Sequence, residues 1–299
     1  MDSKFDITHH WAEILSAHEG HPVTVYNDVD NCILPARPFT YANRSVYGKN
    51  IPKFDASFLI GCLQKGSNCM VDSECYDAHG KPHYSSTGLV QLPEYSMIKE
   101  CGSWCKCSPS TCHNRVISRG AKMYFQIFKT KHCGWGVRTM KNIPKNTYVV
   151  AYVGEVIDNV EADKRGKVYD GQNSTYLFDL DFYDGLFDPN VASPLKASQS
   201  SSQSCQGYVS QNEFVIDAYN TGNVARFINH NCDGNLKVHP FSRANQDPRL
   251  HEIAFFANRD IRFGDELSYD YSGGQEYKGT SRFIACHCGF KKCKGSMLC

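Results

Sequence analysis

The sequence predicts a mostly β protein assembled from several small sheets, and three features of the chain support this. Short runs rich in β-branched and aromatic residues, separated by turn-forming residues, follow residue 121; they span 123–128, 148–153, 176–180, 214–216, 236–238 and 252–256. A charged segment at 159–169 is typical of a helix between strands. The chain also carries 15 cysteines, and most of them lie in clusters.

The first 120 residues have a different texture from the rest. Residues 1–22 predict a short helix, because Trp11, Ile14 and Leu15 have helical spacing, with a disordered tail as the alternative. Residues 23–60 contain short β-prone runs broken by prolines, and we expect them to form an N-terminal extension that packs on the remainder. Residues 61–120 have little periodic apolar pattern, so we expect this segment to depend on metal ions to fold.

Length and composition exclude several classes of protein. A chain of 299 residues with 41% hydrophobic residues can bury a full core, as one large domain or two tightly joined ones. The net charge of +1 argues against a protein that neutralises phosphates, so we expect no direct sequence-specific nucleic-acid binding. No apolar run approaches the roughly 18 residues of a membrane span. The first residues lack a signal-peptide pattern, so we expect an intracellular protein without a membrane partner.

The cysteine spacing predicts two zinc-binding modules. An odd number of cysteines in an intracellular protein argues against structural disulfides. The first cluster exceeds one tetrahedral site and favours two or three zinc ions sharing sulfurs over reduced core cysteines; it comprises Cys62, Cys69, Cys75, Cys101, Cys105, Cys107 and Cys112. The second cluster, Cys286, Cys288 and Cys293, is one ligand short of a closed site, and we expect Cys232 to complete it unless these are exposed tail cysteines. The sequence assigns no role to Cys32, Cys133, Cys205 and Cys299.

Several motifs, taken in order, resemble the SET-domain histone lysine methyltransferases, and within them the Suppressor-of-variegation 3-9 class. The first cysteine cluster resembles the pre-SET module of that class, and the last cysteines resemble its post-SET zinc site. Between them, the matching segments are Gly134-Trp135-Gly136-Val137, 152–155, 175–181, 222–232, 253–256 and 266–271. The resemblance runs from about residue 23 to the end of the chain. Each motif alone is short, but their order and spacing together are specific.

The resemblance implies a SET-domain fold of small β-sheets with a pseudoknot, flanked by zinc-binding pre-SET and post-SET modules. The expected boundaries are 61–120 for pre-SET, 121–272 for SET, and 273–299 for post-SET, with an insertion at about 192–210 that is rich in serine and glutamine. In the pseudoknot, segment 222–232 would supply the cofactor side and segment 266–271 the other half.

The same resemblance implies S-adenosylmethionine as the methyl donor and a lysine side chain as the acceptor. Tyr271 would orient the amine, and Tyr176 would line the lysine channel or contact the cofactor. Tyr269 stands where relatives that trimethylate usually have phenylalanine, which predicts mono- or dimethylation. The cofactor-binding residues would be Gly134, Trp135, Gly136, Tyr176, Arg226, Asn229 and His230, although a structural salt bridge is an alternative role for Arg226.

The leading hypothesis is a nuclear enzyme of heterochromatin that methylates the histone H3 N-terminal tail at lysine 9. Because the chain has no recognisable reader module, we expect a partner to recruit it to chromatin. Two alternatives remain: a catalytically weak SET scaffold that binds chromatin or a partner, and a methyltransferase for another histone or non-histone lysine. The pre-SET segment has seven cysteines where the class has nine, with Gln64 at one missing position and Glu74 or Asp77 near another, which favours the scaffold. The retained residues Tyr271, Asn229, His230 and Cys232 favour the enzyme.

Overall fold

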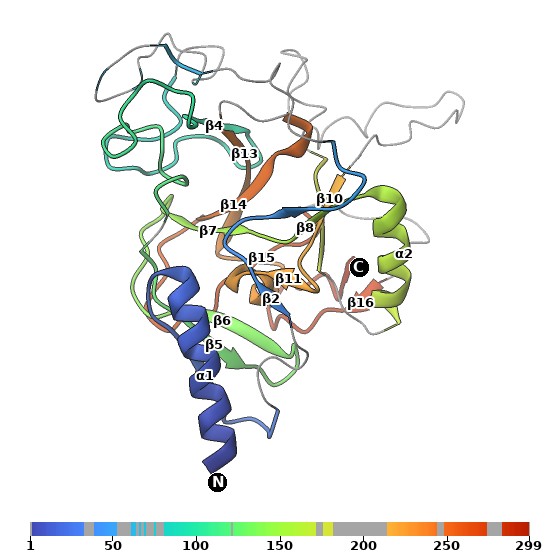
Figure 1. The fold of residues 1–299 in the computed structure, drawn as a ribbon. Coiled ribbons are helices and arrows are strands. Elements are labelled where there is room, and N and C mark those ends of the chain that lie inside the picture. Colours follow the sequence, from blue (N-terminus) through green and yellow to red (C-terminus); the bar gives the residue numbers. More distant parts are fainter. Residues whose placement is uncertain are drawn as a thin grey trace.

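The structure is a computed structural model that describes residues 2–32, 39–52, 61–63, 66, 69, 75, 81–120, 122–171, 176–181, 214–243, 248–273 and 283–298. Within these residues, six small sheets surround one main hydrophobic core, and two α-helices lie on the outside (Figure 1). The mostly β prediction is therefore confirmed. None of the described helices combines the length and hydropathy that crossing a bilayer requires.

The first sheet joins the N-terminal segment to the SET core. Strand β1 (Val23–Tyr26) runs parallel to β5 (Phe125–Lys129), which pairs with β6 (Trp135–Thr139) in antiparallel fashion. Helix α1 (Asp2–Glu19) packs against β1, with Leu15 fully buried and the Ser16 hydroxyl hydrogen-bonded to the Val23 backbone. The prediction of a short helix was therefore wrong in length, because this packing supports 18 residues of helix.

The second sheet has the strand order β3-β8-β10-β9. These strands are β3 (Val46–Tyr47), β8 (Glu155–Asp158), β10 (Phe214–Asp217) and β9 (Leu177–Asp179). Helix α2 (Asn159–Asp170) follows β8 directly, as the charged pattern predicts. Its first turn is capped by Asp158, whose Oδ1 accepts the backbone N–H of Glu161 at 2.8 Å, a standard N-cap contact.

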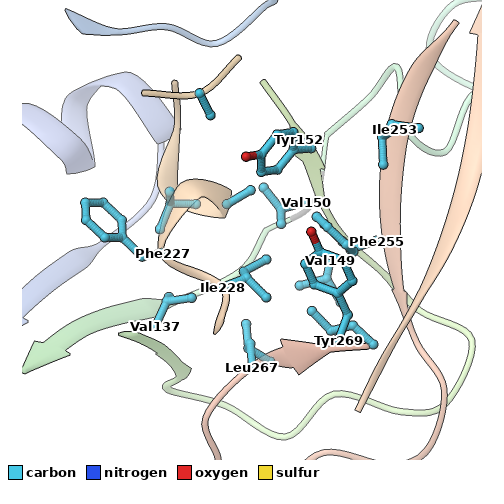
Figure 2. Close-up of a cluster of buried hydrophobic side chains, with 14 of the residues drawn as sticks. Val137, Val149, Val150, Tyr152, Phe227, Ile228, Ile253, Phe255, Leu267 and Tyr269 are labelled. Atoms are coloured by element: carbon cyan, nitrogen blue, oxygen red, sulfur yellow. The ribbon is translucent and has the colours of Figure 1, made fainter. Parts of the chain in front are cut away.

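The third sheet forms the centre of the molecule, with the strand order β4-β13-β14-β7. It contains β4 (Ile98–Glu100), β13 (Leu236–Arg243), β14 (Glu252–Ala257) and β7 (Tyr148–Tyr152). Strand β13 is longer than the predicted run at 236–238, because its pairing with β14 continues as far as Phe241. Figure 2 shows how Ile253 and Phe255 of β14 meet Val149, Val150 and Tyr152 of β7 in the main core.

Three pairings of two or three residues complete the fold. Strand β2 (Thr40–Tyr41) pairs in parallel with β11 (Thr221–Gly222), and β12 (Asn229–His230) pairs in parallel with β15 (Ser268–Tyr269). Near the C-terminus, β16 (Phe283–Ala285) pairs with β17 (Ser296–Leu298). Two short 3-10 helices are η3 (Val224–Phe227) and η4 (Pro248–Leu250). The β12–β15 pairing brings together the two motifs of the predicted pseudoknot.

Several sequence predictions lie outside the described residues. These are the insertion at 192–210, the departures at Gln64, Glu74 and Asp77, and the cysteines Cys205 and Cys299.

Candidate active site and zinc centres

The candidate site lies where β12 and β15 run side by side. Asn229 faces Ser268 and His230 faces Tyr269 in this parallel register, and the Asn231 N–H donates to the Tyr269 carbonyl at 3.0 Å. Gly234 turns the chain so closely over β15 that a Cβ there would lie 2.5 Å from the Tyr269 Cα. Any side chain at position 234 would therefore push the two halves of the pseudoknot apart.

Tyr271 follows β15 and is held at both ends. Its hydroxyl donates to the Ile228 carbonyl at 2.7 Å, and its backbone N–H donates to Nδ1 of His230 at 3.1 Å. Burial, and then the neighbouring Tyr176, raises the pKa of Tyr271 well above its usual value. The hydroxyl therefore stays protonated at neutral pH, with its proton committed to a carbonyl and its lone pairs available to a donor.

His230 connects Tyr271 to a cysteine cluster. Because its Nδ1 accepts from Tyr271, the neutral ring must carry its proton on Nε2, which lies 3.3 Å from the Cys232 Sγ. Burial lowers the pKa of His230, which favours this neutral form. A neutral imidazole that donates to a thiolate and accepts from a backbone amide fixes the orientation of both neighbours.

Tyr269 enters the core from β15. Its ring centroid lies 4.6 Å from that of Tyr271, 4.7 Å from that of Phe255 and 6.0 Å from that of Phe178. Figure 2 shows Tyr269 beside Phe255, on the side of the core that also holds Tyr152. Burial, and then the neighbouring Tyr271, raises the pKa of Tyr269 well above its usual value, so its hydroxyl stays protonated and can accept or donate a bond to a bound molecule.

Tyr176 belongs to a second group of aromatic side chains around the same core. The Tyr152 hydroxyl donates to the Tyr176 carbonyl at 2.9 Å, and the Ala218 N–H donates to the same oxygen at 3.0 Å. The ring of Tyr219 meets that of Tyr176 edge to face, with centroids 5.4 Å apart. Burial, and then the nearby Tyr271, raises the pKa of Tyr152 well above its usual value, so its hydroxyl also stays a donor.

Arg226 lies over the ring of Tyr176 and has no carboxylate within ion-pair distance among the residues that the structure describes. Its Cζ lies 4.7 Å from the Tyr176 ring centroid. Its Nε and Nη2 donate to the carbonyls of Ala218 and Tyr219, at 3.0 and 3.1 Å. The salt bridge considered from the sequence is therefore not found, because backbone oxygens and aromatic rings surround the guanidinium instead.

The two glycines around the start of β6 have different roles: Gly134 precedes the strand and Gly136 lies within it. Gly134 has φ +71 and open space around its Cα, so its role is the left-handed turn. A Cβ at Gly136 would lie 2.8 Å from Glu266 Oε1 and 3.0 Å from Asn229 Nδ2. Asn229 itself donates to the Trp135 carbonyl at 3.3 Å and to Glu266 at 3.0 Å. The lack of a side chain at Gly136 therefore lets this strand lie close against the pseudoknot.

The first cysteine cluster forms a buried module under β4. The described thiols divide into two ligand groups, in each of which the sulfurs lie within 4.8 Å of one another: Cys62, Cys75, Cys101 and Cys105, and Cys101, Cys107 and Cys112. Cys101 belongs to both groups, as a bridging thiolate would. Cys69 is also buried in the cluster but lies outside both groups.

The buried thiols of this cluster affect one another's proton equilibria. The hydrogen bonds that Cys101 shares with Cys105 and Cys112, together with burial, raise the pKa of Cys101, whereas the bond between Cys101 and Cys112 lowers the pKa of Cys112 to about 5. Buried neighbouring thiols therefore cannot all ionise without a cation. Zinc supplies that charge and binds thiolates, so the donor set fits the predicted ion.

The second cluster joins the C-terminal segment to the pseudoknot. Cys232, Cys286, Cys288 and Cys293 place their sulfurs within 4.8 Å of one another, with Cys232 at 3.9 Å from both Cys286 and Cys293. Tetrahedral zinc with Zn–S bonds of about 2.3 Å separates its sulfurs by about 3.8 Å. A disulfide would bring them to about 2.05 Å. The four thiols therefore fit one closed zinc site, and Cys232 lies where the sequence predicts the fourth ligand.

The sequence did not identify several residues that complete the site. Tyr152 and Tyr219 lie around Tyr176, and Lys294 donates to Asp270 and Ser272 on either side of Tyr271, each at 3.0 Å. Tyr152 lies within a matched motif, which was a usable signal, whereas Tyr219 lies outside the matched segments. Lys294 gave none, because its partners lie in a different segment of the chain.

Comparison with known proteins places this site in a family. The SET domain model matches residues 134–272, and the Pre-SET motif model matches residues 15–115. The "Histone-lysine N-methyltransferase, H3 lysine-9 specific" of Schizosaccharomyces pombe is 33% identical over 93% of this chain and 55% of its own length. The Xenopus laevis "Histone-lysine N-methyltransferase SUV39H1" is 36% identical over 88% of this chain and 56% of its own. The chain thus spans little more than half the length of these curated relatives.

Two solved structures share the fold. The Neurospora SET domain protein DIM-5, a histone lysine methyltransferase, superposes with a TM-score of 0.68 at 30% identity, covering 90% of this chain and 100% of that one. KRYPTONITE, solved in complex with DNA, an H3(1-15) peptide and SAH, has a TM-score of 0.72 at 27% identity over 95% of this chain and 53% of its own. Together with the family models and the pseudoknot geometry, these similarities show that the chain belongs to the SET-domain histone lysine methyltransferases of the Su(var)3-9 class.

Proposed function

We propose that this protein is an S-adenosylmethionine-dependent lysine methyltransferase that acts on the histone H3 tail, with lysine 9 as the target and mono- or dimethyl-lysine as the product. The observation that carries the proposal is Tyr271, fixed through its hydroxyl, its amide and His230 at the junction of the two pseudoknot halves. Such anchoring suits a reaction in which positioning supplies most of the rate.

Tyr271 would orient the substrate amine rather than deprotonate it. Its proton is donated to Ile228, so its oxygen can accept an N–H from a neutral lysine amine. This contact directs the nitrogen lone pair toward the methyl carbon that S-adenosylmethionine, when bound, supplies. Because its pKa is raised, Tyr271 stays protonated and cannot act as a base. The proton of the lysine ammonium therefore passes to solvent before transfer.

The cofactor would bind beside the turn before β6. Gly134, Trp135, Gly136, Asn229 and His230 converge on this side of the pseudoknot. The contacts found there are made by backbone carbonyls, an amide and the Glu266 carboxylate, a set that suits a cationic sulfonium donor. Arg226 lies instead over Tyr176, so we propose that it shapes the channel wall rather than touching the cofactor. KRYPTONITE was solved with SAH, the product form of the same cofactor.

Tyr269 would set the number of methyl groups. Its ring lies 4.6 Å from that of Tyr271, and its hydroxyl is available to hold the amine or a water. Either contact reduces the space that successive methyl groups need. We expect the native protein to stop at mono- or dimethyl-lysine and the Tyr269→Phe variant to reach trimethyl-lysine.

The cysteine clusters would hold zinc in structural roles. The post-SET cluster fits one ion, and the pre-SET cluster fits two or three, two of which would share Cys101. The substrate would be a basic peptide: Asp179, the last residue of β9, and Asp181, just beyond the strand, are exposed and would attract a lysine-rich tail. Action on histone H3 would place the protein on chromatin in the nucleus, brought there by a recruiting partner.

Methylation of H3 tail peptides tests this proposal directly. Peptides in which each lysine is replaced in turn by arginine would be incubated with S-adenosylmethionine, and the products read by mass. We expect transfer to fail only when lysine 9 is replaced. Tyr271→Phe removes the hydroxyl but keeps the ring, and should lower kcat at least 100-fold while cofactor affinity changes little.

Three results would contradict the proposal in different ways. Cofactor binding without transfer to any histone lysine would support the SET scaffold. Transfer that survives the lysine 9 replacement would assign another target. Mainly trimethyl-lysine from the native protein, at a low ratio of enzyme to peptide, would remove the role given to Tyr269.

A further inference from the structure

Arg226 connects the N-terminal segment to the wall of the candidate lysine channel. Its Cζ lies 4.3 Å from the ring centroid of Phe39 and 4.7 Å from that of Tyr176. Both distances are within the range of a cation–π contact. The two rings come from distant parts of the chain, and the guanidinium bridges them.

Two hydrogen bonds also fix the Arg226 guanidinium within its own plane. Its Nε and Nη2 donate to the carbonyls of Ala218 and Tyr219. The Ala218 N–H in turn donates to the Tyr176 carbonyl at 3.0 Å, and the Tyr219 ring contacts that of Tyr176. A shift of Arg226 would therefore move both the ring and the backbone neighbours of Tyr176.

Phe39 is itself held rigidly from the N-terminal side. The ring of Trp11 in α1 stacks on it, with centroids 5.7 Å apart and an interplanar angle of 11°. Next to Phe39, the Thr40 N–H donates to the Asn220 carbonyl at 2.8 Å, one residue from Tyr219. The N-terminal segment thus presents a fixed aromatic face to Arg226.

We propose that Phe39 is a positioning residue for Tyr176, acting through Arg226, so that the N-terminal segment forms part of the catalytic apparatus. This inference rests on the proposed function, because it assigns Tyr176 to the lysine channel. Burial lowers the pKa of Arg226, and its interaction with Tyr176 acts in the opposite direction. Removing the Phe39 ring takes away an aromatic face that holds the guanidinium over Tyr176.

The main comparison is between Phe39→Leu, which keeps an apolar side chain, and Phe39→Tyr, which keeps the aromatic face. We expect Phe39→Leu to lower kcat on an H3 peptide about 3- to 10-fold at unchanged KM for S-adenosylmethionine. Phe39→Tyr should stay within about twofold of wild type. Phe256→Leu is the matched control, because Phe256 is a fully buried aromatic of another core cluster; it should lower Tm but keep kcat.

A double-mutant cycle with Arg226→Lys separates a positioning role from general packing. Lysine keeps the charge but loses the planar face. If Phe39 acts through Arg226, the loss of kcat caused by Phe39→Leu should nearly disappear in the Arg226→Lys background. Additive losses would overturn the inference, as would a Phe39→Leu enzyme with wild-type kcat.

Hydrogen exchange of the Ala218 amide provides a readout that does not require turnover. Phe39→Leu should speed this exchange, while Phe256→Leu should leave it unchanged; equal exchange in both variants would overturn the inference. Wild-type transfer to the peptide is measured first, and its absence would count against the proposed function alone. If Phe39→Leu does not fold, Trp11→Leu replaces it in the cycle, because Trp11→Leu removes the ring that stacks on Phe39. An unchanged exchange of the Ala218 amide in the Trp11→Leu variant would overturn the inference.

Discussion

The two cysteine clusters share their ligand chemistry but differ in burial and in what they touch. The pre-SET thiols are all buried, and Cys101 and Cys112 are completely enclosed. Around them, Arg115 donates to the Gly102 carbonyl and Asn114 to the Cys75 carbonyl, so the surrounding contacts stay within the module. The post-SET thiols are half-buried, and one of them, Cys232, belongs to the pseudoknot itself.

Their connections to the rest of the molecule differ in the same way. The pre-SET module meets the central sheet through Glu100 of β4, a fully buried carboxylate that accepts from Tyr84, Ile117 and Ser118. The post-SET cluster is connected to Tyr271 by a single residue, His230. Zinc bound at both clusters would therefore replace a hydrophobic core in one module and, under the proposed function, orient Tyr271 in the other.

Removal of zinc by a chelator should reveal the largest difference between the two clusters. A thiol-competing chelator reaches the half-buried post-SET ligands before the enclosed pre-SET ones, so zinc release should occur in two phases. We expect about one equivalent in the fast phase, accompanied by the loss of nearly all methyl transfer. A colorimetric zinc assay run in parallel with transfer measures this. Activity that falls only with the slow phase would reverse the roles given to the two clusters.

Substitution of single ligands should show the same difference in kinetics. Cys232→Ser should lower kcat more than 100-fold, because it removes both a zinc ligand and the acceptor for His230. Cys107→Ser should instead lower the free energy of unfolding, while the folded fraction keeps kcat within about threefold. Cys32→Ser, at an exposed cysteine outside both clusters, is the control. Equal losses of kcat in the two ligand variants would remove the distinction.

Glu100 tests whether the pre-SET module contributes to the stability of the fold rather than to catalysis. Glu100→Gln keeps the size of the side chain but replaces one acceptor oxygen with an NH2 group. This group would face the donors that Glu100 now accepts from, and a buried unsatisfied donor costs about 2 kcal/mol. We expect the free energy of unfolding to fall by about that amount in chemical denaturation, with kcat unchanged in the folded enzyme. Glu252→Gln, on the neighbouring strand β14 and partly exposed, is a matched control with a smaller expected loss.

Lys294 should give the smallest effect, confined to the post-SET side. Its Nζ donates to Asp270 and Ser272, the two neighbours of Tyr271. Lys294→Ala should lower kcat about 3- to 10-fold with little change in Tm, and Lys294→Arg should recover part of it. Lys291→Ala, at an exposed lysine of the same zinc loop, should match wild type. A fall in Tm without a fall in kcat would give Lys294 a purely structural role.

The sequence predicted the secondary-structure elements and the cysteine groups of this molecule better than its long-range contacts. The strand runs appeared where periodicity placed them, and ligand counting pointed to Cys232 as the partner of the last cysteines. The length of α1 was missed, because Leu15 and Trp11 gain their partners only from β1 and Phe39. The bridge from Phe39 to Tyr176 and the contacts of Lys294 were also missed. These pairs join segments that only the topology brings together, and no local pattern encodes them.

The parallel pairing of β12 with β15, and of β2 with β11, has a consequence for the order in which the protein can assemble. Each pairing joins strands separated by long stretches of chain, and such non-local contacts form slowly. During synthesis on the ribosome, β2 emerges first and cannot pair until β11 has been made. Likewise, Tyr271 can contact His230 only after β15 has been made. The first zinc module can fill long before that moment. Nascent chains should therefore bind metal early but the methyl donor only late, and they leave sheet edges exposed to chaperones during the interval.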